Sequence, residues 1–203
     1  MTFRKNAKLL KLAAINLAAL SSLLVCASAS ADWQLLNKDS QLNFISTKNI
    51  KVSELHHFSN LSGSLTSAGE LSVDIDLSSV ETGIDIRNSR MREKLFMVEN
   101  FPKATLTANL PKEILAFTKG QAGTFTIPAK LSVLGQENDI EVKVQVTKTD
   151  HNRFVATSAQ PVIITAGDYG LQGGIDWLQN VAGLSSISPN VPVTFNLTFI
   201  ELM

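Results

Sequence analysis

The feature that most constrains the fold is a strict alternation of apolar and polar residues along several separate stretches of the chain. Residues 71–78 read LSVDIDLS, residues 140–147 read IEVKVQVT, and residues 193–199 read VTFNLTF. Side chains on a β-strand point alternately to opposite faces of a sheet, so each stretch predicts a strand with one apolar face and one wet face. The sequence therefore predicts an antiparallel, all-β fold.

The number and length of the strands favour a closed sheet. A strand at the edge of an open sheet leaves backbone groups unpaired, and closing the sheet into a barrel removes its edges. We therefore predict a closed antiparallel β-barrel of about eight strands. Further strands are expected at residues 32–36, 41–44, 52–65, 103–110, 123–134 and 153–166. The residues expected to face the barrel interior are Leu42, Phe44, Val73, Ile75, Phe125, Ile127, Leu131, Val142, Val144, Phe195 and Leu197.

Two segments interrupt the alternation and predict short amphipathic helices. In Arg87–Val98 the apolar residues Met91, Leu95 and Val98 recur at helical spacing. Ile175–Leu184, which follows a glycine-rich break, also carries apolar residues along one side. Each helix has an apolar strip that could cover the mouth of the barrel.

The N-terminal residues predict a secretory signal peptide. Four cations precede an apolar run of about 14 residues, which is shorter than the ~20 needed to span a bilayer. Ala29-Ser30-Ala31 has the small-x-small pattern of a cleavage site. We expect residues 1–31 to be removed, residues 32–203 to form one barrel domain, and the protein to be periplasmic. The alternatives are an uncleaved anchor and lipidation at Cys26, for which Val25 is a poor preceding residue.

Charge argues against nucleic acid as a partner. Removing residues 1–31 would remove four cations and no anions, which leaves 14 Lys and Arg against 18 Asp and Glu. This net negative charge argues against binding to nucleic acid, which needs a basic surface, and against a strongly basic surface for contact with a membrane. It would also lack cysteine, so that disulfides could not contribute to its stability.

Motifs for catalysis or metal binding are missing from the sequence. His56 and His57 are neighbours on an expected strand, so their side chains should point to opposite faces and could not readily bind one ion together. His151, the third histidine, falls in an expected turn, and no zinc-type spacing is found. We therefore expect neither an enzyme nor a metal site or cofactor, although an enzyme that uses His56 or His57 stays open as an alternative.

Several pieces of the chain, in their order and spacing, resemble the YceI-like family of secreted lipid-binding proteins. The resemblance covers nearly all of residues 32–203. Two departures indicate a divergent branch: Asn88 stands where the family usually has Asp, and Ala166–Leu171 replaces a late family passage. The matching pieces are Trp33 with Ser40–Phe44, Gly63, Leu77–Thr82, Arg87–Phe96, Phe101–Leu106, Ala129–Gly135 and Val191–Phe195.

The resemblance implies a lipocalin-like barrel, a periplasmic location and an isoprenoid chain inside the barrel. Arg87, Arg90 and Arg92 would then lie at a wet rim, where they could contact the head group of the lipid or quinone. The alternative is a solvated basic face with no role in binding.

Together these patterns predict a non-enzymatic carrier for a long-chain amphiphile of the polyisoprenoid or isoprenoid-quinone type. The same apolar residues would also make an ordinary packed core. The alternative is therefore a filled barrel that acts as an interaction partner in an envelope stress or redox complex. The sequence does not indicate the oligomeric state.

Overall fold

The computed structural model describes residues 32–149 and 152–202. The predicted signal peptide with Cys26, and His151, lie outside the described residues. Eight antiparallel strands form a closed ring, because the first strand pairs with the last, Trp33 opposite Glu201. This confirms the predicted barrel. In ring order the strands are β1 (Trp33–Leu35), β4 (Leu61–Leu65), β5 (Glu70–Asp76), β7 (Lys103–Asn109), β8 (Ala122–Val133), β9 (Gln136–Lys148), β10 (Arg153–Ser158) and β12 (Asn190–Glu201).

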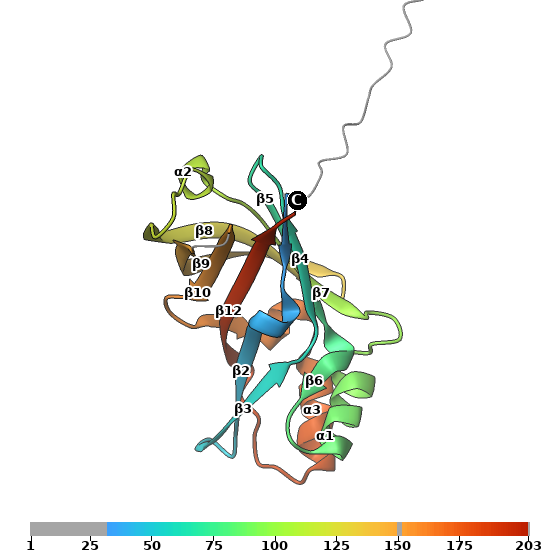
Figure 1. Ribbon diagram of the computed structural model, residues 1–203. Helices are drawn as coiled ribbons and strands as arrows, with labels where there is room; N and C mark the ends of the chain where they lie inside the picture. The colour runs from blue at the N-terminus through green and yellow to red at the C-terminus, as the bar shows by residue number, and fades with distance from the viewer. Residues whose placement is uncertain (1–31, 150–151, 203) are drawn as a thin grey trace, which may run out of the picture.

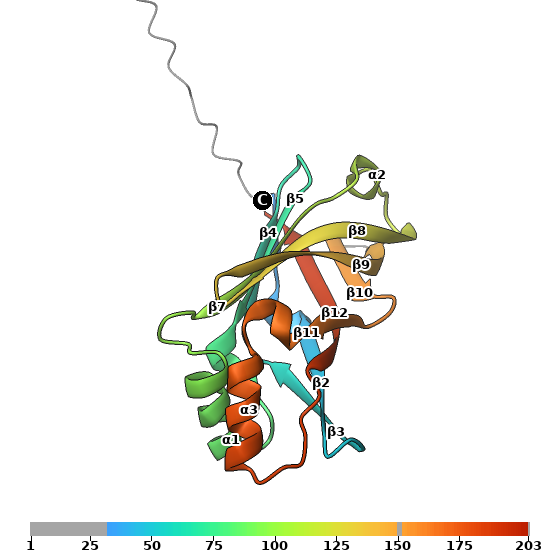
Figure 2. The ribbon, with the colours of Figure 1, turned by 180° about the vertical axis from the view of Figure 1, so that it is seen from behind.

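Toward one end of the barrel, β12 leaves the ring and pairs with other strands. The second half of β12 pairs with β1 and β10, whereas its first half pairs with two other strands. These are β2 (Gln41–Lys48) and β11 (Val162–Thr165). Beyond β2 the sheet continues through β3 (Val52–Phe58) to β6 (Val80–Glu81). Figure 1 shows β2, β3 and β6 in the lower half of the molecule, and Figure 2 shows β11 near its middle.

The predicted strand over residues 52–65 is broken into β3 and β4, which pair with different neighbours. Asn37, in the 3-10 turn η1 (Asn37–Asp39), spans the break. Its Nδ2 donates to the Ser59 carbonyl at 3.0 Å, and its Oδ1 accepts from the Leu61 amide at 2.8 Å. The side chain thus replaces backbone bonds that the break removes. The predicted strand over residues 153–166 is likewise two strands, β10 and β11, and the short turns η2 (Leu77–Ser79) and η4 (Ala166–Tyr169) follow β5 and β11.

Two helices cover the open end, side by side in Figure 2. The first is α1 (Asp85–Arg90), which continues into a wider π-helical turn, η3 (Met91–Leu95). The second is α3 (Gln172–Val181). Both were expected from the sequence, with shifted ends. The first ends before Val98 because Met97 adopts a left-handed backbone, with φ 47°.

The helix α3 begins earlier than predicted and includes two glycines. Gly173 and Gly174 were interpreted as a break before the helix, but both lie within it. A Cβ on Gly174 would lie 2.8 Å from the Leu95 Cα and 2.8 Å from the Lys94 carbonyl oxygen. Only glycine therefore lets α3 approach η3 this closely.

The opposite end of the barrel carries a helix that the sequence analysis did not predict, α2 (Lys112–Leu115). It has only four residues, too few to show a helical period. Its Ile114 is 1% exposed and packs into the barrel interior. Within the described residues, no helix is both long and apolar enough to cross a bilayer.

Candidate functional site

The barrel interior holds two adjoining apolar cavities of about 180 and 100 Å³. Their walls are lined by apolar residues throughout, and five residues line both, so the two spaces adjoin along the barrel. The shared residues are Leu42, Ile75, Leu106, Val142 and Phe195. The interior is therefore not completely filled by side chains, as it would be in an ordinary packed core.

The structure places ten of the eleven residues predicted to face inward around these cavities. The exception is Phe125. It has the inward parity on β8, but it lies beyond the cavity and packs against Phe117, with ring centroids 6.0 Å apart. The ten are Leu42, Phe44, Val73, Ile75, Ile127, Leu131, Val142, Val144, Phe195 and Leu197.

The helices supply part of the wall, as their apolar strips predicted, but Val98, the third residue of the first strip, lines neither interior cavity. Met91 and Leu95 of η3 and Ile175 of α3 are buried and line the larger cavity. Phe96 also lines it, which the predicted helical spacing missed. The wider π turn explains this, because the Phe96 amide donates to the Met91 carbonyl five residues back, at 2.9 Å.

The smaller cavity ends at α2, which closes this end of the barrel. Ile114 and Leu110 line it there, together with Phe154. Trp33 packs edge-on against Phe154 with ring centroids 5.7 Å apart, and the Lys148 ammonium lies 4.1 Å from the centroid of Phe154. Aromatic rings and a cation over their faces make this a sealed end.

At the other end, a third cavity of about 360 Å³ lies between the β2–β3 hairpin and the helices α1 and α3. We call it the mouth. It shares five lining residues with the larger interior cavity: Phe44, Met91, Leu95, Ile175 and Val191. Unlike the interior, it is also lined by polar groups, and these are Ser46, Lys48, Glu54, His56, Arg87, Arg90 and Ser188.

Arg87 is the best-connected charged group of the mouth. Its Nη1 lies 2.6 Å from Glu54 Oε2, which joins α1 to β3. Its Nε and Nη2 donate to Thr82 Oγ1 and the Thr82 carbonyl, at 2.9 and 2.6 Å. Lys48 also binds Glu54, at 2.9 Å. The hydrogen bond from Lys48, with that from Arg87, lowers the pKa of Glu54, so the carboxylate stays charged.

The three predicted rim arginines occupy different positions. Arg87 and Arg90 line the mouth. Arg92 does not; its guanidinium donates to the Ser78 carbonyl at 3.4 Å and to Ser89 Oγ at 3.2 Å, on the outer side of the helix. Asn88, at the position where the family usually has Asp, is buried, and its Oδ1 accepts from the Thr82 amide and hydroxyl.

His56 is the polar residue that the sequence analysis left without a role, and it lies in the wall of the mouth, 3% exposed. Its Nε2 and Ser46 Oγ are hydrogen-bonded at 2.9 Å, and its buried Nδ1 has no hydrogen-bond partner among the described residues. Burial, with the positive charge of Arg87, lowers its pKa from the ordinary value of 6.5. The neighbouring His57 is exposed on the other face of β3, as predicted. No cluster of three potential metal ligands is found in residues 32–149 and 152–202.

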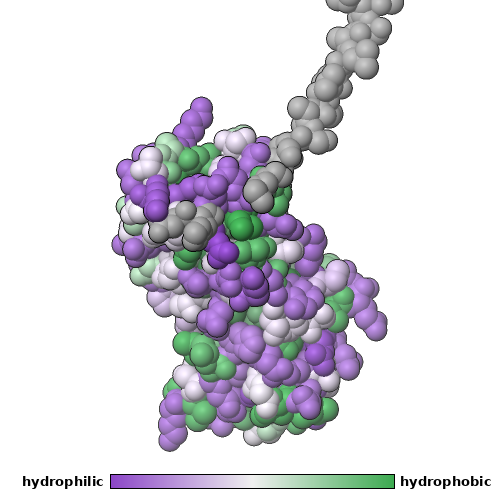
Figure 3. Space-filling model, in the orientation of Figure 1, coloured by the Kyte–Doolittle hydropathy of each residue, from purple (hydrophilic) through white to green (hydrophobic). Residues whose placement is uncertain are grey.

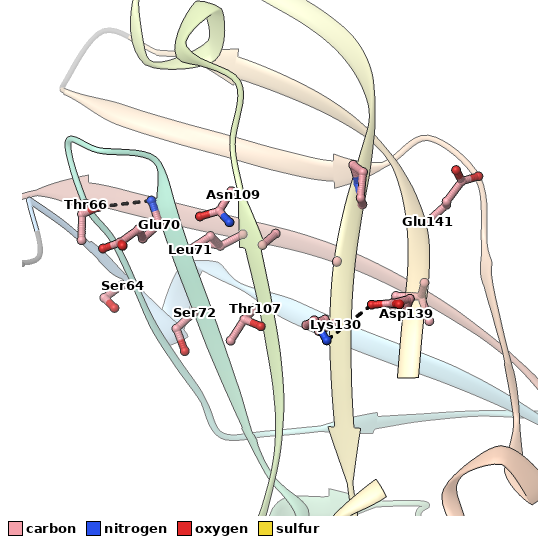
Figure 4. Close-up of a pocket in the computed structure, with 14 residues that line it drawn as sticks. Ser64, Thr66, Glu70, Leu71, Ser72, Thr107, Asn109, Lys130, Asp139 and Glu141 are labelled. Carbon is pink, nitrogen blue, oxygen red and sulfur yellow. Dashed lines mark hydrogen bonds and ion pairs between the residues drawn. The ribbon is translucent and has the colours of Figure 1, made fainter. Parts of the chain in front are cut away.

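A further hollow, of about 870 Å³, is a shallow groove on the outside of the barrel. Figure 4 shows its polar side chains, such as Ser72, Thr107 and Lys130, standing on β5, β7 and β8. The Lys130 ammonium lies 3.7 Å from Asp139 across it. An open groove with this lining cannot exclude water from a hydrocarbon tail, so the interior is the better candidate.

Comparison with known proteins supports the fold and the family resemblance. A sequence profile of the YceI-like domain matches residues 33–199. The solved structure of a polyisoprenoid-binding domain from Saccharophagus degradans, implicated in plant cell wall breakdown, is 36% identical. The alignment covers 85% of this chain and 100% of that one, with a TM-score of 0.82. BcnA from Burkholderia cenocepacia shares the fold at 18% identity, with 81% and 98% of the two chains covered and a TM-score of 0.62. No match was found among curated proteins.

Proposed function

Because the chain belongs to the YceI-like family, we propose that it is a periplasmic carrier for a long-chain amphiphile of the polyisoprenoid or isoprenoid-quinone type. The family has the fold of binding proteins, and the proposed carrier does no chemistry on its ligand. The related domain from Saccharophagus degradans is described as polyisoprenoid-binding, which supports this ligand class.

One observation carries the proposal: an apolar interior adjoins a mouth that is partly polar. A ligand that fits both has a long hydrocarbon tail and a compact polar head. Each CH₂ group moved from water into such an interior contributes about 0.8 kcal/mol, so a tail needs no specific hydrogen bonds to bind. Taken together, the three adjoining cavities reach the size of known ligand sites, about 300–1,000 Å³.

The mouth suits the head group. Arg87 and Arg90 line it, and the buried ring of His56 has one nitrogen without a hydrogen-bond partner among the residues that the structure describes. A phosphate or a quinone carbonyl accepts hydrogen bonds from groups of this kind. Arg92 has no place in this site, since it lies on the outer side of the helix.

Native mass spectrometry of protein purified from a periplasmic extract without detergent tests the proposal, with solvent extraction of the same sample. We expect an additional mass that is lost on denaturation and that the extract identifies as a prenyl lipid or quinone. A clean unliganded mass, with no uptake when a polyprenol and a ubiquinone are offered, would refute the carrier function. Recovery of the protein only from the cytosol would refute the location.

A further inference from the structure

Several large apolar side chains around the mouth are exposed to water. Three of its apolar side chains are more than half exposed: Ile50 at 87%, Leu55 at 67% and Ile86 at 59%. Ile84, Val181, Val52 and Trp177 are exposed to a smaller extent. They come from the three elements that enclose the mouth, the β2–β3 hairpin, the start of α1 and α3, and Leu55 lies on the outer face of β3, which also carries His57. Figure 3 shows apolar surface at this lower end, interspersed with polar surface, and further apolar areas in the upper half of the molecule.

Ile50 is exposed and also conformationally unfavourable. It lies in the turn between β2 and β3, where both Asn49 and Ile50 have left-handed backbones, with φ 50° and 69°. Glycine adopts this conformation freely, whereas for a β-branched residue it is a true outlier. A residue that costs free energy in the backbone and exposes its side chain to water points to a role outside folding.

The turn is held to the segment that follows α3. Asn49 Oδ1 accepts from the amide and the hydroxyl of Ser185, at 2.9 and 3.0 Å, and the Asn49 amide donates to the Ser186 carbonyl at 2.9 Å. Gln179 of α3 donates through Nε2 to the Ser185 carbonyl at 3.3 Å, so the apolar tip of the hairpin and the end of α3 form one rim around the mouth.

Charge is distributed unevenly between this rim and the rest of the chain. The β2–β3 hairpin, α1 with η3, and α3 together carry six Lys or Arg and four Asp or Glu. The rest of residues 32–203 carries eight Lys or Arg against fourteen Asp or Glu. The net negative charge that argued against a strongly basic membrane footprint thus lies elsewhere. Lys51 follows Ile50 directly, and the Lys94 ammonium lies 5.8 Å from the ring centroid of Trp177.

We infer that the rim is a docking surface for a lipid bilayer that contains anionic lipids, with the mouth of the barrel facing the membrane. Exposed Ile and Leu enter the boundary between head groups and acyl chains, Trp lies at head-group depth, and Lys and Arg contact lipid phosphates. This goes beyond the proposed function, because the surface would bind a bilayer whether or not the barrel holds a lipid.

The test is flotation with vesicles of two compositions, one an equimolar mixture of phosphatidylethanolamine and phosphatidylglycerol, the other pure phosphatidylcholine. The unaltered protein should float with the anionic vesicles and bind phosphatidylcholine more weakly, and bromine-labelled lipid should quench Trp177 fluorescence. In the double variant Ile50→Gly/Leu55→Thr, vesicle affinity should fall by about tenfold or more, since binding scales with the apolar area inserted. Lys51→Glu should weaken binding to the anionic vesicles only.

Controls separate docking from folding and from ligand binding. Leu202→Ser and Lys112→Glu change an exposed leucine and an exposed lysine near the sealed end, and vesicle binding should not change. Ile50→Gly should keep or raise the midpoint of urea unfolding, because glycine suits the turn. The double variant should take up a prenyl lipid from solvent as the unaltered protein does, since neither residue lines the cavities.

Failure of the unaltered protein to bind either vesicle would overturn the docking surface, and so would equal binding by the double variant. Specific capture of an envelope protein that depends on Ile50 and Leu55, without vesicle binding, would assign the rim to a protein partner instead. None of these results bears on the carrier function, which depends on the bound mass alone.

Discussion

The two ends of the barrel are held together by different kinds of contact. At the sealed end Ile114, Trp33 and Phe154 are buried, and the rings of Trp33 and Phe154 pack against each other. At the mouth, the chain instead places an ion pair between Arg87 and Glu54 and leaves apolar side chains exposed. An end that only has to hold the fold together buries its apolar surface. The mouth, which we propose admits the ligand, has its walls on separate elements, and an ion pair joins two of them.

The largest difference between the ends should appear in stability. Ile114→Ala, at the sealed end, should lower the free energy of unfolding by about 2–5 kcal/mol, because it removes a fully buried side chain and leaves a cavity. Ile86→Ala, at the rim, should change it by less than about 0.5 kcal/mol. Urea unfolding of both variants measures the contrast. Equal effects would mean that the two ends contribute alike to the fold.

The packing of the two mouth helices should depend on a single glycine. Gly174→Ala should cost about 1–3 kcal/mol, because its Cβ would collide with the backbone of η3. Gly173→Ala is the matched control: a Cβ there has no neighbour within 4 Å, so alanine should stabilise the helix by up to about 1 kcal/mol. Thermal unfolding distinguishes them. If both variants had the same effect, the close approach of α3 and η3 would not matter.

The ion pair that joins α1 to β3 should contribute less. Arg87→Gln should lower the free energy of unfolding by about 1–2 kcal/mol, a value reduced for partial screening by water, since it removes bonds to Glu54 and Thr82. Arg92→Gln, on the outer side of the same helix, should change it by less than about 0.5 kcal/mol. Chemical denaturation at low and high salt measures both. A larger loss for Arg92 would contradict the different positions of the two arginines.

Acid should weaken the mouth through His56. Its pKa is lowered in the folded state, so the unfolded chain binds the proton more readily. The free energy that this group contributes to folding is therefore fully present above its ordinary pKa of 6.5. It is lost as the pH falls through the lower pKa of the folded state. The unfolding midpoint should decrease between about pH 7 and pH 5, and His56→Gln should flatten that decrease. His57→Gln, on the exposed face, should leave it unchanged.

How far the sequence predicts this molecule depends on whether a feature is periodic. The alternation along β9 places Val142 and Val144 on the inner face without any tertiary information. It cannot say how far the cavity extends, and so Phe125 has the inward parity yet lies beyond it. The bond between Glu54 and Arg87 joins residues 33 positions apart, and only the three-dimensional arrangement of β3 and α1 brings them together.

The helices show the same limit. Met91 and Leu95 could be assigned to an apolar strip from their spacing, but the π turn that adds Phe96 leaves no signal in a short sequence. Gly174 was interpreted as a helix break. It is glycine because a side chain there would collide with the backbone of η3, and the sequence alone does not show this contact. His56 could be placed opposite His57, but not in the wall of a cavity.

The account rests on an interior that holds a hydrocarbon tail, and one paired measurement tests it most directly. Leu131→Trp fills the larger cavity from the inner face of β8, whereas Lys130→Trp places the same side chain on the outer face of that strand. Native mass spectrometry of both, with circular dichroism to verify the fold, should find that Leu131→Trp loses the bound lipid and Lys130→Trp retains it. A folded Leu131→Trp protein with a full complement of lipid would show that the ligand does not occupy the barrel.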